Sequence, residues 1–453
     1  MKRQAAPSFT GPEGRERPPE RRGERDAESP EEESRNSLIR TTLGVRTLAA
    51  SARTYKEYPI CFDAAIARAL RDLSRRVDRR VSRASAGDSP PTYLHGSKEV
   101  FGNVIFGGEF HLPRRRVRAV VESAPLRPSG PGRPPEEGED SIYTRVSVYT
   151  RRGDRSRASA LFELVDREVY ERNPLRGRAI NIYGDPEEVP DVDWGDVAVP
   201  AHFAREVEEN LFWPLLHGPR LDAAGLGRPR GLLLEGERGM GKSLLAAIIA
   251  RKVRGRATFL KVLPSDAERL GWGYIFDVAR ALEPAVLYVE DIENLAPSKA
   301  RYNLVNTPLS ELLLYLDSPQ HRGHVFLLAT TNTPDMVELA LLDRPGRVDR
   351  RLVFDPRNRS DFGTEWRTRV FDIHLRGYKL APGIAPADLA RSIEEVPYTG
   401  AHIAELVHTA VLEALGRAGK GGGKRPVLTE DDFRKARERV ERMVRGRGGA
   451  EIS

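Results

Sequence analysis

Residues 236–243 follow the pattern G-x-x-x-x-G-K-[ST]. Apolar runs at 231–234 and 244–250 flank them, which predicts a buried strand, a glycine-rich turn and a helix in that order. Glycines let successive backbone N–H groups face an anion, and the new helix directs its positive end to the same place. A surface turn that fits the pattern by chance is the alternative, and the flanking strand and helix argue against it. The sequence therefore predicts a protein that binds a nucleoside triphosphate.

Two residues of this phosphate loop have distinct expected tasks. Lys242 is expected to reach the β- and γ-phosphates, and the Ser243 hydroxyl is expected to hold Mg²⁺. The nucleotide-binding residues expected in and next to the loop are Gly236, Glu237, Arg238, Gly239, Met240, Gly241, Lys242, Ser243 and Leu244.

The composition narrows the class of protein. With 453 residues, of which 39% are hydrophobic and 31% charged, the chain has enough material for two or three globular domains. It shows no apolar run long enough to span a bilayer and no secretory leader pattern, so we expect a cytoplasmic protein without a membrane segment. The single cysteine, Cys61, excludes a framework of internal disulfides.

The net charge of +7 is compatible with binding to nucleic acid through phosphate contacts. Arginine is spread along the whole chain, however, and is not gathered in one segment. Such a spread is typical of solvated faces and of genome composition bias. Nucleic acid is therefore a possible partner that the charge does not favour.

Changes in composition divide the chain into five segments. Residues 1–36 mix Pro, Gly, Glu and Arg with almost no large apolar side chains, so we expect a disordered tail. Residues 37–190 mix helix and strand patterns and form an expected α+β N-terminal domain. Residues 191–356 alternate strands and helices, which predicts a parallel sheet with ligands at the carboxyl ends of its strands. A helical region at 357–445 and a flexible tail at 446–453 are expected to follow.

Within the N-terminal domain, residues 37–81 have mostly helical spacing. A strand–helix–strand pattern then occupies 144–149, 158–170 and 179–183. The acidic, proline-bearing stretch 185–190 is the expected linker to the α/β segment.

Two carboxylates, Glu290 and Asp291, follow the buried strand pattern at 286–289. Two solvated acids at a strand exit are the alternative, but desolvating adjacent acids is costly, so a structural role is disfavoured. A metal and a lytic water account for them better. We expect Glu290 to hold the water shell of Mg²⁺ and Asp291 to polarise the attacking water.

Three further polar residues complete the expected chemistry. Asn332 follows the buried strand pattern at 325–330, where its amide can orient the water or contact the γ-phosphate. Arg347 and Arg350 come next along the chain. They are either a structural salt-bridge cluster or arginine fingers that stabilise transition-state charge in a neighbouring subunit's site.

Taken in this order, the motifs resemble those of the AAA ATPases of the classical clade. Residues 229–236 are similar to the strand leading into Walker A, 289–293 to Walker B, and 329–332 to sensor 1. The other similar segments are 193–197 at the adenine cradle, 341–350 in the second region of homology, 369–374 at the start of the lid, 398–403 before the sensor 2 helix and 428–436 in the last helix. The resemblance covers roughly residues 191–443.

The resemblance implies a P-loop NTPase fold. A parallel sheet with helices on both faces would be followed by a small all-α lid and preceded by the separate α+β domain. ATP and Mg²⁺ are the implied cofactors. The resemblance also places Asp196 and Val197 at the adenine, His374 near ribose and adenine, and Gly400 and Ala401 in the lid.

The resemblance further implies an ATP-hydrolysing homo-oligomeric ring, commonly a hexamer. Arg347 and Arg350 match the family's arginine fingers, so each site would lie between two subunits. Such rings remodel or disassemble protein complexes in a chaperone-like way. A protein client of unknown identity is therefore the implied partner, with residues 37–190 as the substrate or adaptor domain.

The chain departs from the family pattern in two places. Most members place Asp before Glu at Walker B, whereas Glu290 precedes Asp291 here, which predicts slow but real hydrolysis. The same order occurs in the mitochondrial AAA translocases that insert the Rieske protein, and residues 144–183 loosely resemble their amino-terminal domain, although their membrane anchor is not found here. The pore aromatic that threading members carry after the second strand is also not at its usual position. Trp272, which lies between two glycines, is either that aromatic in a displaced position or a core residue, and the second interpretation is slightly favoured. Ala401, in place of the sensor 2 arginine of other clades, agrees with the classical clade.

Two alternative functions stay open at this point. A nucleotide-gated assembly module would bind ATP and oligomerise with little hydrolysis, as the Glu290–Asp291 order suggests. A nucleic-acid-associated ATPase would use the basic flanks of the chain.

Overall fold

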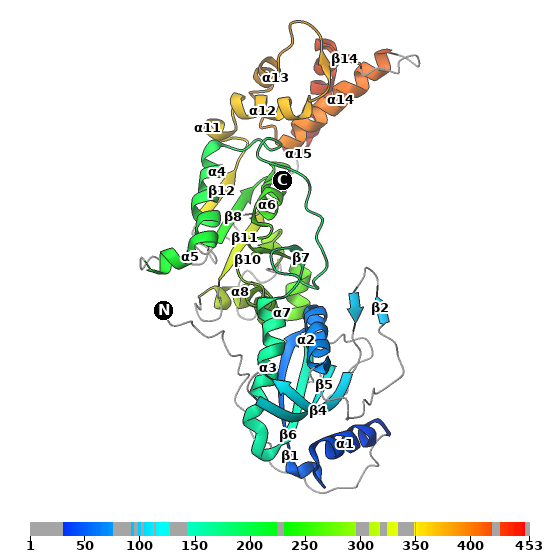
Figure 1. The fold of residues 1–453 in the computed structure, drawn as a ribbon. Helices are drawn as coiled ribbons and strands as arrows, with labels where there is room; N and C mark the ends of the chain where they lie inside the picture. The colour runs from blue at the N-terminus through cyan, green and yellow to red at the C-terminus, as the bar shows by residue number, and fades with distance from the viewer. Residues whose placement is uncertain are drawn as a thin grey trace.

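Figure 1 shows the computed structural model of the chain as three parts arranged along its long axis. The structure describes residues 30–75, 92–94, 98–100, 104–112, 115–126, 143–223, 231–295, 308–317, 324–333, 348, 350–418 and 426–448. An antiparallel sheet with helices forms one end, an α/β core lies in the middle, and a helical part forms the other end.

The N-terminal part is built on a four-stranded antiparallel sheet in the order β1-β6-β5-β4. Its strands are β1 (Ser51–Pro59), β4 (Val104–Leu112), β5 (Arg115–Leu126) and β6 (Tyr143–Arg151), with a small pair β2 (Thr92–Leu94) and β3 (Lys98–Val100) beside them in the chain. Its helices are α1 (Pro30–Leu43), η1 (Leu48–Ala50), η2 (Ile60–Phe62), α2 (Asp63–Arg75), η3 (Arg152–Arg157), α3 (Ser159–Asp166) and the π-helical turn η4 (Arg167–Glu171).

The α/β core is built on a six-stranded parallel sheet in the order β12-β8-β11-β10-β9-β7. The strands are β7 (Ala179–Asn181), β8 (Gly231–Gly236), β9 (Thr258–Val262), β10 (Ala285–Val289), β11 (Val325–Thr331) and β12 (Arg350–Phe354). The helices around them are α4 (Ala201–Val207), η5 (Glu208–Phe212), α5 (Trp213–Ala223), α6 (Lys242–Val253), α7 (Pro264–Ala281), η6 (Ile292–Leu295) and α8 (Pro308–Asp317).

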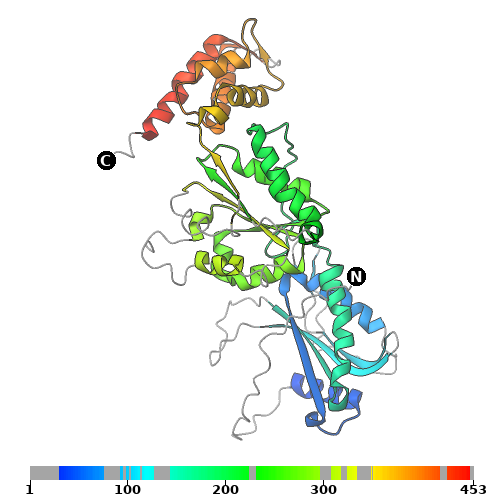
Figure 2. The same cartoon turned by 90° about the vertical axis from the view of Figure 1, so that its left-hand side faces the viewer.

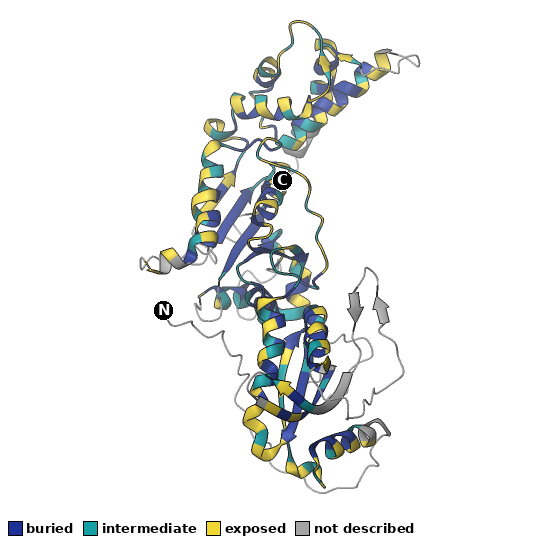
Figure 3. Ribbon diagram, in the orientation of Figure 1, coloured by how far each residue is buried: buried dark blue, intermediate teal, exposed yellow. Residues whose placement is uncertain are grey.

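The buried strands of this sheet supply two cores, because successive side chains of a strand point to opposite faces. Leu233 packs in the core that contains α7 and α8, whereas Leu232 and Leu234 pack in the core that contains α4 and α6. Figure 2 shows the sheet between its helical layers, and Figure 3 shows its central strands as buried. This is the predicted P-loop NTPase arrangement, with helices on both faces and loops at the carboxyl edge.

The C-terminal part is an all-α lid apart from two short strands. Its helices are α11 (Arg359–Phe362), α12 (Thr364–His374), α13 (Pro386–Ser392), α14 (Gly400–Ala418) and α15 (Glu430–Gly448), and its strands are β13 (Lys379–Leu380) and β14 (Val427–Leu428). The last helix extends past residue 445, where the sequence predicts a flexible tail to begin. The lid shares one continuous apolar core with the helices on one face of the α/β sheet.

Two expectations at the N-terminus differ from the structure. The predicted tail, 1–36, ends too late: α1 begins at Pro30, a residue type suited to the first turn of a helix. The buried Leu38, Ile39 and Leu43 pack α1 on the antiparallel sheet, which makes the preceding turn part of the fold. The expected helical region, 37–81, also contains strand β1.

The predicted boundary of the N-terminal domain is also corrected by the sheet topology. The strand expected at 179–183 is β7, which pairs with β9 at the edge of the parallel sheet. Alternation of apolar residues predicts a strand but not the neighbouring strand with which it pairs. The sequence spacing therefore assigned β7 to the N-terminal domain, whereas the strand belongs to the parallel sheet. The N-terminal part also packs against α7, where the ring of Tyr143 lies edge-on to that of Tyr274 at 5.4 Å between centroids.

Candidate nucleotide-binding site

The phosphate loop runs between β8 and α6 at the carboxyl edge of the parallel sheet. Gly236 has a φ of 137°, and a Cβ there would lie 2.1 Å from the carbonyl oxygen of Phe354 on β12. Gly239 has a φ of 80°, and a Cβ there would lie 2.5 Å from the Cβ of Ala401 on the lid helix α14. Both positions therefore require glycine, because the loop is pressed between a strand and the lid.

Lys242 opens α6 and is almost fully buried. Its Nζ donates hydrogen bonds to the carbonyl oxygens of Gly236 and Glu237, at 2.5 and 3.0 Å, and to Oδ1 of Asn332, at 2.9 Å. Burial lowers the pKa of Lys242 below its ordinary value, while the negative charge of Asp291 opposes that shift. The ammonium is thus placed at the end of the pocket where a nucleotide would carry its phosphates.

The predicted metal residues lie next to each other. The Ser243 hydroxyl donates to Oε1 of Glu290 at 3.1 Å. A hydroxyl and a carboxylate suit Mg²⁺, which commonly takes only one or two protein oxygens and completes its shell with water and phosphate. The residues present therefore fit the ion, which Ser243 and Glu290 would hold.

Asp291 is held by the neighbouring strand β11. Its backbone N–H donates to Oγ1 of Thr330 at 3.0 Å, and its Oδ1 accepts a hydrogen bond from Nδ2 of Asn332 at 2.7 Å. Asp291 has a φ of 49°, the one positive value among the non-glycine residues that the structure describes. Strained backbone of this kind is costly and is concentrated at functional sites, and here it accompanies a carboxylate fixed toward Asn332.

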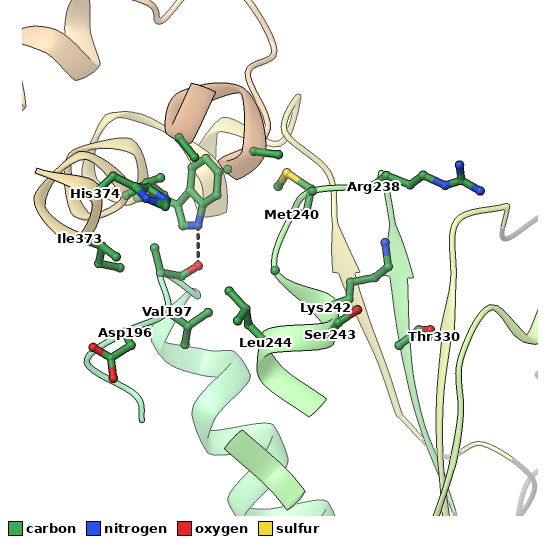
Figure 4. A pocket seen from close by; sticks show the side chains of 18 of the residues that line it. Asp196, Val197, Arg238, Met240, Lys242, Ser243, Leu244, Thr330, Ile373 and His374 are labelled. Atoms are coloured by element: carbon green, nitrogen blue, oxygen red, sulfur yellow. Dashed lines mark hydrogen bonds between the residues drawn. The ribbon is translucent and has the colours of Figure 1, made fainter. Parts of the chain in front are cut away.

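The base end of the pocket lies between the lid and the segment before α4. The indole N–H of Trp366 on α12 donates to the carbonyl oxygen of Ala198 at 2.7 Å, drawn as the dashed line in Figure 4. His374 and Asp196 lie at this end, opposite Lys242 and Thr330. Burial lowers the pKa of His374, which favours the neutral imidazole expected beside a base.

Together these groups line one pocket of about 500 Å³. The predicted site residues that line it are Asp196, Val197, Arg238, Gly239, Met240, Gly241, Lys242, Ser243, Leu244, Glu290, Asp291, Asn332, His374, Gly400 and Ala401. Gly236 and Glu237 do not line the pocket, but their carbonyl oxygens accept hydrogen bonds from Lys242.

The chain matches known proteins over this region. Residues 232–356 match the ATPase family associated with various cellular activities (AAA). This chain carries an AAA ATPase domain. Over 264 residues it is 31% identical to a cell division cycle protein 48 homolog of Archaeoglobus fulgidus, which covers 56% of this chain and 34% of that protein.

Two further relatives agree with the classical AAA type. The chain is 30% identical over 286 residues to proteasome-activating nucleotidase 2 of Halobacterium salinarum, covering 60% of this chain and 66% of the relative. It is 31% identical over 243 residues to a proteasome-activating nucleotidase of Methanothermobacter thermautotrophicus, covering 51% and 56%. The chain thus spans between 34% and 66% of the length of these curated relatives. In the described ranges, no helix has the length and apolarity needed to cross a membrane.

Arg350, one of the two predicted arginine fingers, lies apart from the pocket of its own chain. Arg347 is outside the described residues. Arg350 is the first residue of β12 and pairs with Leu232 of β8. Leu232 lies near the start of β8, whereas the phosphate loop follows the end of that strand. Its Nε donates to Oδ1 of Asn210 at 3.2 Å and lies 3.3 Å from Oε2 of Glu206. Arg350 therefore does not line the pocket of its own chain.

Several residues of the AAA pocket were missed by sequence reasoning. They are Ala198, Thr330, Trp366, Val370, Ile373 and Ala404. Thr330 is the next-to-last residue of β11, so its polar side chain at the end of an apolar run was a usable signal. Trp366 and Val370 precede His374 by two turns and one turn of α12, and helical spacing from that histidine would have found both.

Trp272 is a core residue of the AAA domain. Its side chain is fully buried near Phe276, as the slightly favoured interpretation expected. It follows Gly271, whose φ of 73° interrupts α7. Trp272 therefore offers no aromatic surface to a client in this structure.

Proposed function

We propose that this chain binds ATP with Mg²⁺ and hydrolyses it, as one subunit of a homo-oligomeric ring that remodels a protein client. The observation that carries the proposal is the continuous contact from Lys242 through Asn332 to Asp291. It joins the phosphate-binding cation, the sensor amide and the general base across the ends of three strands. When bound, Mg²⁺ would supply charge neutralisation for the phosphates, with Ser243 and Glu290 at its shell.

In this proposal each side chain has one task in hydrolysis. Lys242 neutralises charge on the β- and γ-phosphates, and the neutral Asn332 amide orients the attacking water. Asp291 accepts hydrogen bonds from that water and polarises it for in-line attack. Asp196, Val197 and His374 hold the base between the core and the lid.

Support for the ring comes from Arg350 at the start of β12, which does not line the pocket of its own chain. In the proposed ring its guanidinium leaves Glu206 and Asn210 and stabilises the developing charge of the transition state in a neighbouring copy. Arg347 is the second proposed finger. The proposed ring is hexameric, and residues 37–190 are its proposed client or adaptor domain.

Subunit mixing tests the shared site. Asp291→Asn chains keep the fingers and lose the base, whereas Arg350→Ala chains keep the base and lose a finger. We expect each variant alone to hydrolyse ATP at less than about one hundredth of the unmodified rate. Mixed at equal amounts, they regain turnover well above the sum of the two, because some interfaces pair an intact base with an intact finger. Turnover of the mixture equal to that sum would contradict a shared site.

The assembly module is the second candidate, and the Glu290–Asp291 order favours it. In the structure Oδ1 of Asp291 accepts a hydrogen bond from the Asn332 amide, and an assembly module would keep this contact in place of a contact to an attacking water. An assembly module predicts that ATP drives oligomerisation while turnover stays negligible at every protein concentration. The proposed machine predicts turnover per subunit that rises as the ring assembles. A pull-down with the Asp291→Asn chain, which stays in its ATP state, then identifies the client. Recovery of nucleic acid in that pull-down would instead support a nucleic-acid-associated ATPase.

A further inference from the structure

A third carboxylate, Glu293, stands one turn beyond the two predicted acids, in η6. Its Oε1 accepts hydrogen bonds from the backbone N–H of Asn332, at 3.0 Å, and from the Nδ2 of the same residue, at 3.4 Å. Its Oε2 is buried and has no hydrogen-bond partner among the described residues. Glu293 is not in the wall of the nucleotide pocket, so this carboxylate acts on the site through Asn332.

The hydrogen bonds fix which way the Asn332 amide points. An ammonium only donates and a carboxylate only accepts. The oxygen Oδ1 therefore faces Lys242, and the nitrogen Nδ2 faces Asp291 and Glu293. A flipped amide would set its oxygen against two carboxylates.

Two of these three partners have other duties during the reaction. Lys242 turns to the phosphates of a bound nucleotide, and Asp291 turns to the attacking water. Glu293 touches neither, so it alone keeps its contact to the amide throughout. It also grips the backbone of Asn332, which fixes the point from which the side chain extends.

We propose that Glu293 is a positioning residue for hydrolysis, which keeps the Asn332 amide aimed at the γ-phosphate and the lytic water. The inference rests on the proposed function and adds a residue to it. Because the carboxylate lies behind Asn332, it affects turnover of bound ATP and leaves the affinity for ATP unchanged. The buried, unpartnered Oε2 is the cost of placing a charge at this position.

Glu293→Gln is the first test, with Asn294→Gln as the matched control on the exposed side of the same turn. Glutamine at 293 keeps one acceptor oxygen for the two donors of Asn332 but loses the negative charge that strengthens both hydrogen bonds, so it holds the sensor amide less firmly. We expect kcat to fall about tenfold or more. The equilibrium affinity for a fluorescent ATP analogue should change by less than about twofold, and the melting temperature by less than about 2 °C. Asn294→Gln is expected to match the unmodified chain in all three measurements.

Glu293→Asp supplies a second variant that keeps the charge and shortens the reach. It is expected to recover part of the lost kcat. Equal losses of affinity and kcat, an unchanged kcat, or unfolding of both variants would each overturn the positioning role, since all three describe a merely structural carboxylate. Asp291→Asn in the same assay separates the two proposals. If it too turns over at the unmodified rate, the proposed function fails; if it alone is inactive, only the role of Glu293 fails.

Discussion

The two ends of the nucleotide pocket are built in different ways. The phosphate end comes from one edge of one sheet, where β8, β10 and β11 finish side by side. The base end comes from segments far apart in the chain, as the bond from Trp366 to Ala198 across 168 positions shows. A nucleotide seated in this pocket would therefore contact one sheet edge at its phosphates and a joint between core and lid at its base.

The joint is the segment 191–198, whose halves are fastened to different parts. Its first half is tied to the core helix α6, where Nη1 of Arg251 lies 2.7 Å from Oδ1 of Asp191. Its second half is tied to the lid helix α12, through Arg369 to the Trp194 carbonyl oxygen at 2.7 Å and through Trp366 to Ala198. A turn of the lid against the core would therefore shift the residues proposed to hold the base.

Gly236→Ala is the prediction with the largest expected effect, and it concerns the phosphate end. The new Cβ would lie 2.1 Å from the Phe354 carbonyl oxygen at a φ of 137°. Forcing β12 from β8 and straining the backbone is expected to cost about 3–5 kcal/mol of unfolding free energy and to abolish ATP binding. Chemical denaturation and equilibrium nucleotide binding check both.

The control for this substitution is Gly416→Ala in the lid helix α14, where a Cβ would meet nothing within 4 Å. It is expected to be neutral or to stabilise by up to about 1 kcal/mol, because alanine is the better helix former. A wild-type affinity for ATP in Gly236→Ala would contradict the requirement for glycine at this position.

Trp366→Phe tests the base end and has the next largest effect. It keeps an aromatic ring but leaves the Ala198 carbonyl oxygen without its donor, which costs about 1–2 kcal/mol. We expect affinity for ATP to fall about tenfold, with kcat at saturation little changed, since the acids and Lys242 are untouched. Trp213→Phe, at an exposed indole on α5, is the matched control. A loss of kcat without a loss of affinity would reverse the comparison between the two ends.

The same contrast explains what the sequence could predict. The phosphate end was predicted residue by residue, because Gly239, Lys242 and Ser243 are neighbours in the chain and Asp291 and Asn332 each follow an apolar strand. Strand ends of a parallel sheet meet at one edge whatever the loops do. Local spacing was therefore enough.

The base end and the sheet assignments needed tertiary contacts. Trp366 was missed because an aromatic in an amphipathic helix normally reads as core, and its hydrogen bond partner is far away in the chain. β7 was given to the wrong domain because alternation does not name the neighbouring strand. Strand β1 was not predicted, because residues 37–81 were interpreted as helical. A spacing of four residues, such as that between Tyr58 and Phe62, fits both the helical period and the strand period.

Charge reversal at Arg376 and Asp196 is a smaller test of the joint. Nη1 of Arg376 lies 2.6 Å from Oδ1 of Asp196, and both side chains are largely exposed. Arg376→Glu and Asp196→Arg are each expected to weaken ATP binding about two- to fivefold, with part of the loss recovered in the double variant. A binding cycle at low and high salt measures the coupling, which should shrink as salt rises. Strictly additive losses would mean that this pair does not hold the joint.

The pH dependence of stability gives the smallest predicted effect. Burial lowers the pKa of His374 below the ordinary 6.5, so the unfolded chain takes up a proton at a higher pH than the folded chain. The stability that this group contributes is therefore complete above about pH 6.5 and decreases as the pH falls below it. His374→Gln should flatten that part of a plot of melting temperature against pH. Bound ATP covers the imidazole further and should steepen the wild-type slope, while an unchanged slope with ATP would place the base away from His374.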